Sequence, residues 1–130
     1  MKFSVAVFGA PYSSQASLTA LRFSTAVIEA KHDLYRVFFY HDGVYCGNSL
    51  ITPPQDEINI NEAWCNLAKT HDTELVVCIA SALRRGMLDK TEADRYEKTA
   101  WNLSPEFTVS GLGQLIDAGL ESDRLVTFLP

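Results

Sequence analysis

The chain has 130 residues, of which 47% are hydrophobic and 21% are charged, so it is long and apolar enough for one domain with its own core. Its formal net charge is −5, and its basic residues are scattered apart from Arg84 and Arg85, which disfavours a nucleic-acid surface because phosphate binding needs clustered Lys and Arg. No apolar run approaches the length of a membrane span, and the first residues have a strand pattern without the features of a signal peptide.

Strand and helix patterns alternate along the chain. Short apolar runs rich in β-branched residues predict strands over residues 2–8, 34–40, 74–79, 105–109 and 124–128. Apolar residues at helical spacing or helix-forming runs predict helices over residues 15–30, 62–70, 80–86, 90–95 and 111–119. This alternation implies βαβ units with right-handed crossovers. We therefore expect a single α/β domain over residues 1–130, with a central, mainly parallel sheet and helices on both faces.

Two segments carry more specific expectations. Residues 45–59 form the longest irregular segment, which contains Pro53 and Pro54, and loops of this length often bind partners or serve function. In the last predicted helix, four apolar residues are expected to form the buried stripe: Leu112, Leu115, Ile116 and Leu120.

Cys78 lies where the apolar run of residues 74–79 turns into the start of a helix. In a parallel sheet, ligands and chemistry gather at the C-terminal ends of the strands. A thiol at a helix start meets unpaired N–H groups and the positive end of the helix dipole, which favour the nucleophilic thiolate. Arg84 and Arg85 follow closely, as auxiliary groups or as a solvated helix end. Cysteine is also among the most buried residue types, so a packing role for Cys78 stays open on this pattern.

The positions of the other two cysteines give less support for a reactive role. Cys46 stands beside Gly47 in the long loop, where it could be exposed and reach another thiol, but no motif supports a role and we treat it as incidental. Cys65 lies in a predicted helix beside Trp64 and is interpreted as a packing residue. An odd number of irregularly spaced cysteines, without CxxC or zinc spacing, is typical of reduced thiols and predicts a cytoplasmic protein.

Other motifs do not support a nucleotide site or an acid/base pair. Gly9 follows the first strand, but the segment lacks the further glycines of a dinucleotide site and the Gly-Lys-Ser/Thr of a P-loop. His41 and Asp42 are adjacent on a turn, where neighbouring side chains seldom face each other, so we interpret them as solvated.

Several segments resemble the DsrE/TusD family, and the match runs through almost the whole chain in register. The segments are 38–44, 52–57, 76–86, 110–115 and 123–126. The resemblance implies a small α/β protein of a sulfur relay that needs no metal or organic cofactor. In this family one cysteine carries sulfane sulfur as a persulfide. Its position within Val-Val-Cys-x-Ala-x-Ala-x-Arg-Arg-Gly falls on Cys78 here, and Cys46 lies outside the family pattern.

The resemblance also implies partners. A TusA-like carrier would donate the sulfur, and a TusE-like or DsrC-like protein would accept it. Family members form heterohexamers with TusB-like and TusC-like subunits or their DsrH and DsrF counterparts, and we expect residues 45–59 to make such contacts. The TusD branch feeds sulfur towards 2-thiouridine at the tRNA wobble position, whereas the DsrE branch oxidises stored sulfur. The sequence leaves both branches open.

Two other functions stay open as alternatives. The chain could be a non-catalytic assembly subunit of a DsrEFH-type or TusBCD-type complex, although a cysteine at the matching position weighs against this. It could instead be a homo-oligomer that binds a small ligand at the strand ends, which an apolar pocket there would favour. In the sulfurtransferase reading, we expect Arg84 or Arg85 to stabilise negative charge near the persulfide or to contact an acidic partner.

Overall fold

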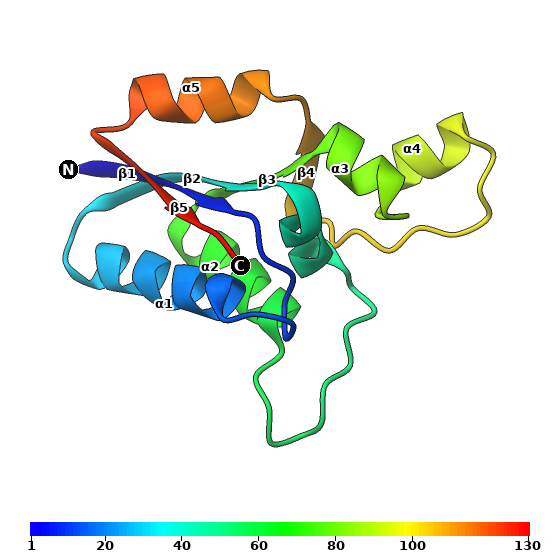
Figure 1. Ribbon diagram of the computed structural model, residues 1–130, viewed down its shortest axis with the longest axis horizontal. Helices are drawn as coiled ribbons and strands as arrows, with labels where there is room; N and C mark the ends of the chain where they lie inside the picture. The colour runs from blue at the N-terminus through cyan, green and yellow to red at the C-terminus, as the bar shows by residue number, and fades with distance from the viewer.

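A five-stranded, wholly parallel sheet lies at the centre of the molecule (Figure 1), and the computed structural model describes residues 1–130. Its strands are β1 (Lys2–Val7), β2 (Asp33–Phe39), β3 (Glu74–Cys78), β4 (Phe107–Ser110) and β5 (Arg124–Phe128). Their order across the sheet is β4-β3-β2-β1-β5. The predicted parallel sheet is therefore confirmed, and every predicted strand is present with its ends shifted by at most two residues.

Helices cover both faces of this sheet, as predicted. They are α1 (Ala16–Glu29), α2 (Ile60–His71), α3 (Ile79–Arg84), α4 (Lys90–Arg95) and α5 (Gly113–Glu121), with a 3-10 helix, η1 (His41–Gly47). α1 and α2 pack on one face and α5 covers the other, while α3 and α4 lie beyond the C-terminal ends of β3 and β4 (Figure 1). None of these helices is both long enough and apolar enough to cross a membrane.

The core is divided by the alternation of side chains along the strands. Leu75 and Val77 of β3 point towards α1 and α2 and belong to a cluster of 20 buried residues. Val76 and Cys78 point the other way, towards α5, and form a small cluster with Phe38. Because successive strand residues face opposite sides, strands covered on both faces have continuous apolar sequences.

The chain turns sharply after β2 and enters η1. His41 has a left-handed backbone conformation with φ of 49°, and its N–H donates a hydrogen bond to Ser81 Oγ at 3.1 Å. η1 then passes over the end of β1, where Gly43 packs against the carbonyl group of Val7. The prediction of an irregular segment over 45–59 is wrong at its start, because residues 45–47 belong to η1.

Gly43→Ala is expected to lower the free energy of unfolding by about 3 kcal/mol, because the added methyl group would overlap the Val7 carbonyl and shift the backbone of η1. Urea unfolding measures this. The matched control is Gly113→Ala, where an added Cβ meets nothing within 4 Å and should leave stability equal or slightly raised. Equal effects of the two substitutions would contradict the close packing of Gly43.

The predicted buried stripe of α5 is wrong. Leu112, Ile116 and Leu120 are 45%, 64% and 79% exposed, and only Leu115 packs against the apolar cluster under the helix. The buried residue of α5 is Ala118. The sheet surface below α5 includes the buried, charged Arg36, so the helix turns Asp117 inward to meet that charge and its leucine stripe outward.

Candidate functional site around Cys78

Cys78 is the last residue of β3 and the N-cap of α3, as the sequence predicted. Its backbone pairs with Ser110 of β4, and its side chain lies on the α5 face of the sheet. Tyr40, from the end of β2, and Leu115 of α5 pack against its cluster. The residue is only 2% exposed. A partner that reacts with this thiol must therefore displace part of its cover.

The surroundings of the thiol can stabilise negative charge through the backbone. The first-turn N–H groups of α3 have no partner within the helix, and the positive end of the helix dipole lies there. The Cys78 side chain makes no capping hydrogen bond to the backbone N–H groups of α3. The apolar side chains that pack with it are aromatic and aliphatic.

The two arginines of the motif lie at the opposite end of α3. At a rise of about 1.5 Å per residue, Arg84 lies about 9 Å and Arg85 about 10.5 Å from Cys78 along the helix axis. Arg85 forms an ion pair with Asp42, with Nε 2.7 Å from Oδ1, and also donates to the Ser81 carbonyl at 3.2 Å. Arg84 is exposed and forms no ion pair within the chain. The structure therefore does not bring either guanidinium to the thiol.

Aromatic rings line the neighbouring strand ends. The rings of Tyr40 and His41 lie 4.2 Å apart, and Phe8 packs edge-on against Tyr40 at 5.1 Å, both distances between ring centroids. Asp42 pairs with Arg85, so His41 and Asp42 do not form an acid/base pair. Sequence reasoning missed Tyr40 as part of the site, although its place after the strand that pairs with β3 could have indicated it.

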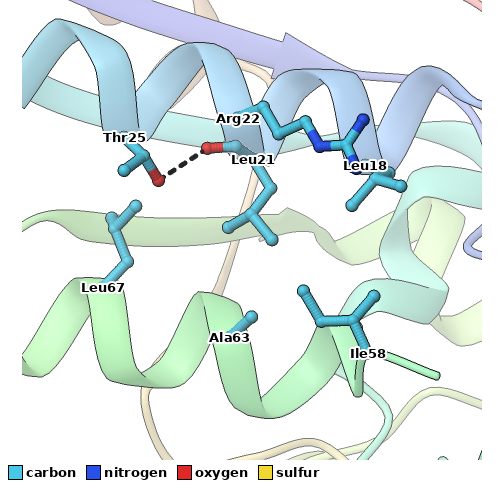
Figure 2. Close-up of a pocket in the computed structure, with 7 residues that line it drawn as sticks. All are labelled: Leu18, Leu21, Arg22, Thr25, Ile58, Ala63 and Leu67. Carbon is cyan, nitrogen blue, oxygen red and sulfur yellow. Dashed lines mark hydrogen bonds between the residues drawn. The ribbon is translucent and has the colours of Figure 1, made fainter. Parts of the chain in front are cut away.

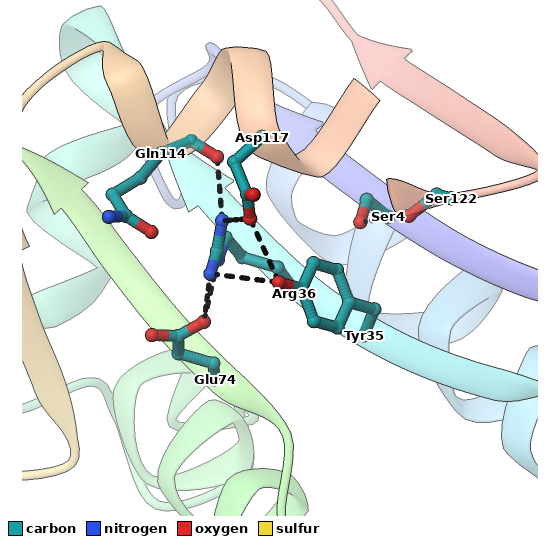
Figure 3. Close-up of polar contacts among 7 residues, drawn as sticks. All are labelled: Ser4, Tyr35, Arg36, Glu74, Gln114, Asp117 and Ser122. Carbon is teal, nitrogen blue, oxygen red and sulfur yellow. Dashed lines mark hydrogen bonds and ion pairs between the residues drawn. The ribbon is translucent and has the colours of Figure 1, made fainter. Parts of the chain in front are cut away.

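A buried arginine holds α5 over this part of the sheet (Figure 3). Arg36 is 5% exposed, and its guanidinium contacts Glu74 Oε2 at 2.6 Å, Asp117 Oδ2 at 2.7 Å and the Gln114 carbonyl at 2.8 Å. Tyr35 donates a hydrogen bond to the same Asp117 oxygen at 2.8 Å. This bond and Arg36 lower the pKa of the Asp117 carboxyl below its ordinary value. The network fixes α5 on the sheet. It thereby fixes the position of Leu115, which packs against the cluster that contains Cys78.

The other two thiols are buried in the core. Cys46 is fully buried, because η1 folds back on the sheet, and its sulfur lies 3.1 Å from Ser17 Oγ. Burial raises the pKa of Cys46 to about 12. Cys65 is buried in the main core cluster, which confirms its packing role. Burial, followed by a hydrogen bond with Glu106, raises the pKa of Cys65 to about 11. Both thiols are therefore protonated at neutral pH.

The raised pKa of Cys46 predicts a loss of stability in alkali. Unfolded Cys46 ionises near its ordinary pKa of 9.0, whereas the folded thiol keeps its proton up to about 12, so the free energy of unfolding falls as the pH rises between these values. At about pH 10 the loss from this thiol is about 1.4 kcal/mol relative to about pH 8. Urea unfolding at both pH values should show a decrease smaller by that amount in Cys46→Ala. An equal decrease in both proteins would mean that folded Cys46 ionises freely.

An apolar groove lies elsewhere, between α1 and α2 (Figure 2). It has a volume of about 420 Å³ and is lined by seven residues: Leu18, Leu21, Arg22, Thr25, Ile58, Ala63 and Leu67. α1 and α2 cover the face opposite to Cys78, so this groove gives no support to a small-ligand site at the strand ends. No group of three or more His, Cys, Asp or Glu side chains is placed to hold a metal ion.

Comparisons with known proteins identify relatives over the whole chain. The profile of the DsrE/DsrF-like family matches residues 1–128. A DsrE protein of Allochromatium vinosum, named as a sulfurtransferase, is 48% identical over 128 residues, which cover 98% of this chain and 98% of the relative. Sulfurtransferase TusD of Salmonella dublin and that of Salmonella enteritidis are each 44% identical, over 98% of this chain and 100% of the relative.

A solved structure shows the same fold. The crystal structure of the ychN protein from E. coli matches with a TM-score of 0.74 at 23% identity and covers 98% of this chain and 99% of that chain. The resemblance seen in the sequence motifs is confirmed by the family profile and by the two groups of relatives. The chain belongs to the DsrE/DsrF-like family, and it is a sulfur-relay sulfurtransferase.

Proposed function

We propose that Cys78 carries the transferred sulfur as a persulfide. The observation that supports this most directly is the contrast among the three thiols. Cys78 caps α3 at the C-terminal edge of the sheet, where the helix dipole favours a thiolate, whereas Cys46 and Cys65 lie in the main core cluster. Since the thiolate is the nucleophile, Cys78 is the thiol best placed to attack a sulfane sulfur.

The transfer consists of two exchanges at sulfur. The Cys78 thiolate attacks the terminal sulfur of a donor persulfide. A new S–S bond forms, the donor S–S bond breaks, and the donor leaves as a thiolate that takes up a proton. An acceptor thiolate then attacks the outer sulfur of the Cys78 persulfide and releases the Cys78 thiolate. Neither exchange changes the total number of electrons held by the sulfur atoms, so no external oxidant or reductant takes part.

The partners follow from the same proposal. A TusA-like protein donates the sulfur, and a TusE-like or DsrC-like protein accepts it. TusB-like and TusC-like subunits, or their DsrH-like and DsrF-like counterparts, complete a heterohexamer, and the chain alone can form homo-oligomers. An outward apolar stripe, formed by the N-cap Leu112 and by Ile116 and Leu120 of α5, supports contact with another subunit because it is exposed. The three unpaired cysteines fit a cytoplasmic location.

The experiment is a two-stage transfer followed by intact-protein mass spectrometry. The wild-type chain is incubated with a small persulfide donor, freed of the donor, and mixed with a TusE-like or DsrC-like acceptor. We expect one added sulfur on the chain, which then moves to the acceptor. Loading without transfer to either acceptor would contradict the relay. No loading, with or without TusB-like and TusC-like subunits, would favour the non-catalytic assembly subunit.

A further inference from the structure

A second groove lies beside α3, on the side of the molecule that carries α4. It has a volume of about 490 Å³ and is lined by Leu83, Arg84, Gly86, Leu88, Tyr96 and Lys98. Its leucines are half-buried, and the Tyr96 side chain stands 51% exposed at its edge. At Gly86, where φ is +70°, an added Cβ would meet nothing within 4 Å, so no side chain of the chain fills this part. The groove therefore offers an apolar surface that the fold leaves uncovered.

The charge of this groove is opposite to that of the chain. Its two charged lining residues, Arg84 and Lys98, are both basic and exposed, and neither forms an ion pair within the chain. The net charge of the whole chain is −5. A partner segment that seats here would therefore meet two free cations on an otherwise acidic protein.

The acidic side chains of the neighbouring α4 are already engaged. Asp94 pairs with Lys90 at 2.8 Å, and Glu92 pairs with Arg95 at 3.2 Å. Asp89 accepts the N–H of Glu92 as the helix N-cap. Glu97, next to Lys98 in the chain, is exposed but does not line the groove. No carboxylate within the groove competes with an acidic ligand.

We infer that this groove docks an acidic segment with an apolar anchor, which belongs to the protein that accepts sulfur from this chain. The inference rests on the proposed function, because it places the docking site of that same reaction. The apolar anchor would contact Leu83, Leu88 and the ring of Tyr96. The acidic residues would pair with Arg84 and Lys98. This gives the basic end of α3 a role in recognition, apart from the chemistry at Cys78.

Distance allows a partner docked in the groove to reach the thiol. Leu83 and Arg84 lie about 8 to 9 Å along α3 from Cys78, a span that three extended residues of a partner cover. The Cys78 thiol is only 2% exposed, so the reacting sulfur of a partner must be brought to it on a short arm. We assign the groove to the acceptor, and transfer to the acceptor protein is the step that the test measures.

The test uses the double variant Arg84→Glu with Lys98→Glu and the TusE-like or DsrC-like acceptor that the wild-type chain loads. We expect the second-order rate constant of transfer to that acceptor to fall about tenfold or more at low salt, with a weaker salt dependence, because like charges now oppose association. Loading by a small persulfide and unloading by dithiothreitol should stay at wild-type rates. The matched control is Arg22→Glu with Lys31→Glu, which makes the same charge change at exposed residues of α1 and the turn after it.

The outcomes separate docking from sulfur chemistry. A wild-type rate to the protein acceptor, or an equal loss in the control variant, would overturn the docking site. An equal loss with dithiothreitol would also overturn it and place the arginine in the chemistry at Cys78. Binding of a fluorescent acceptor is measured in parallel on Cys78→Ser proteins, where no transfer can occur. Weaker binding of the charge-reversed chain there supports docking even if the persulfide proposal fails.

Discussion

Cys78→Ser is expected to abolish sulfur loading, with a decrease in the loading rate of about a thousandfold or more. A serine hydroxyl stays protonated and does not attack a sulfane sulfur, so no persulfide forms at residue 78. The substitution replaces one sulfur of a small cluster with a smaller, more polar hydroxyl oxygen and should leave the fold intact. Intact-protein mass spectrometry after incubation with a small persulfide donor measures the added sulfur.

The matched controls are Cys46→Ala and Cys65→Ser, which remove the two buried thiols. Both variants should load one sulfur at the wild-type rate. The thiols that they lack have pKa values of about 12 and about 11 in the folded wild-type chain and so are not nucleophilic thiolates at neutral pH. Equal loading of Cys78→Ser and wild type, with a loss in Cys46→Ala, would move the carrier to Cys46. That result would require the 3-10 helix η1 to open, since Cys46 is fully buried within it.

Arg36→Ala is expected to lower the free energy of unfolding by about 3 kcal/mol and to uncover Cys78. The substitution leaves Glu74 and Asp117 without their shared cation and breaks the hydrogen bond to the Gln114 carbonyl. α5 then loses the polar contacts that fix it on the sheet, and Leu115 loses its fixed position over the cluster of Cys78. Urea unfolding measures the first effect, and the rate of Cys78 alkylation by iodoacetamide measures the second.

The matched control is Lys90→Ala, which breaks the ion pair between two exposed side chains, Lys90 and Asp94. Its effect on the free energy of unfolding should stay below about 1 kcal/mol, because water screens exposed pairs, and the alkylation rate should not change. If Arg36→Ala destabilises the protein but alkylation of Cys78 stays slow, α5 is not the cover that controls access. Tyr40, the other residue packed against this cluster, would then be the next residue to replace.

The sequence alone determined the order and type of nearly all elements, because apolar spacing along a strand or helix is a local property. It also placed Cys78 at the end of β3 and the start of α3, since both signals lie within a few residues of each other. The parallel sheet followed from the alternation of elements and is confirmed by the strand order. Which cysteine carries sulfur is a prediction from this position and from the family resemblance.

Tertiary structure decided what lies against each face. Four apolar residues at α5 were predicted to be buried, yet three of them, Leu112, Ile116 and Leu120, point outward. The reason is that Arg36 sits under the helix and draws Asp117 towards the sheet. Arg36 was visible in the sequence only as a lone charge in an apolar strand, and its carboxylate partners lie 38 and 81 residues away. Such pairing depends on which strands and helices become neighbours in space, which local spacing does not encode.

The same reason explains Cys46 and the basic groove. The sequence placed Cys46 in the irregular segment 45–59 without a role, but η1 folds over the sheet and buries it, so it is a core residue. Arg84 and Lys98 are far enough apart in sequence that no motif joins them, and they meet in one groove only because the chain returns past α3 after α4. Local patterns thus defined the elements, while long-range packing decided which side chains are buried, paired or free to bind.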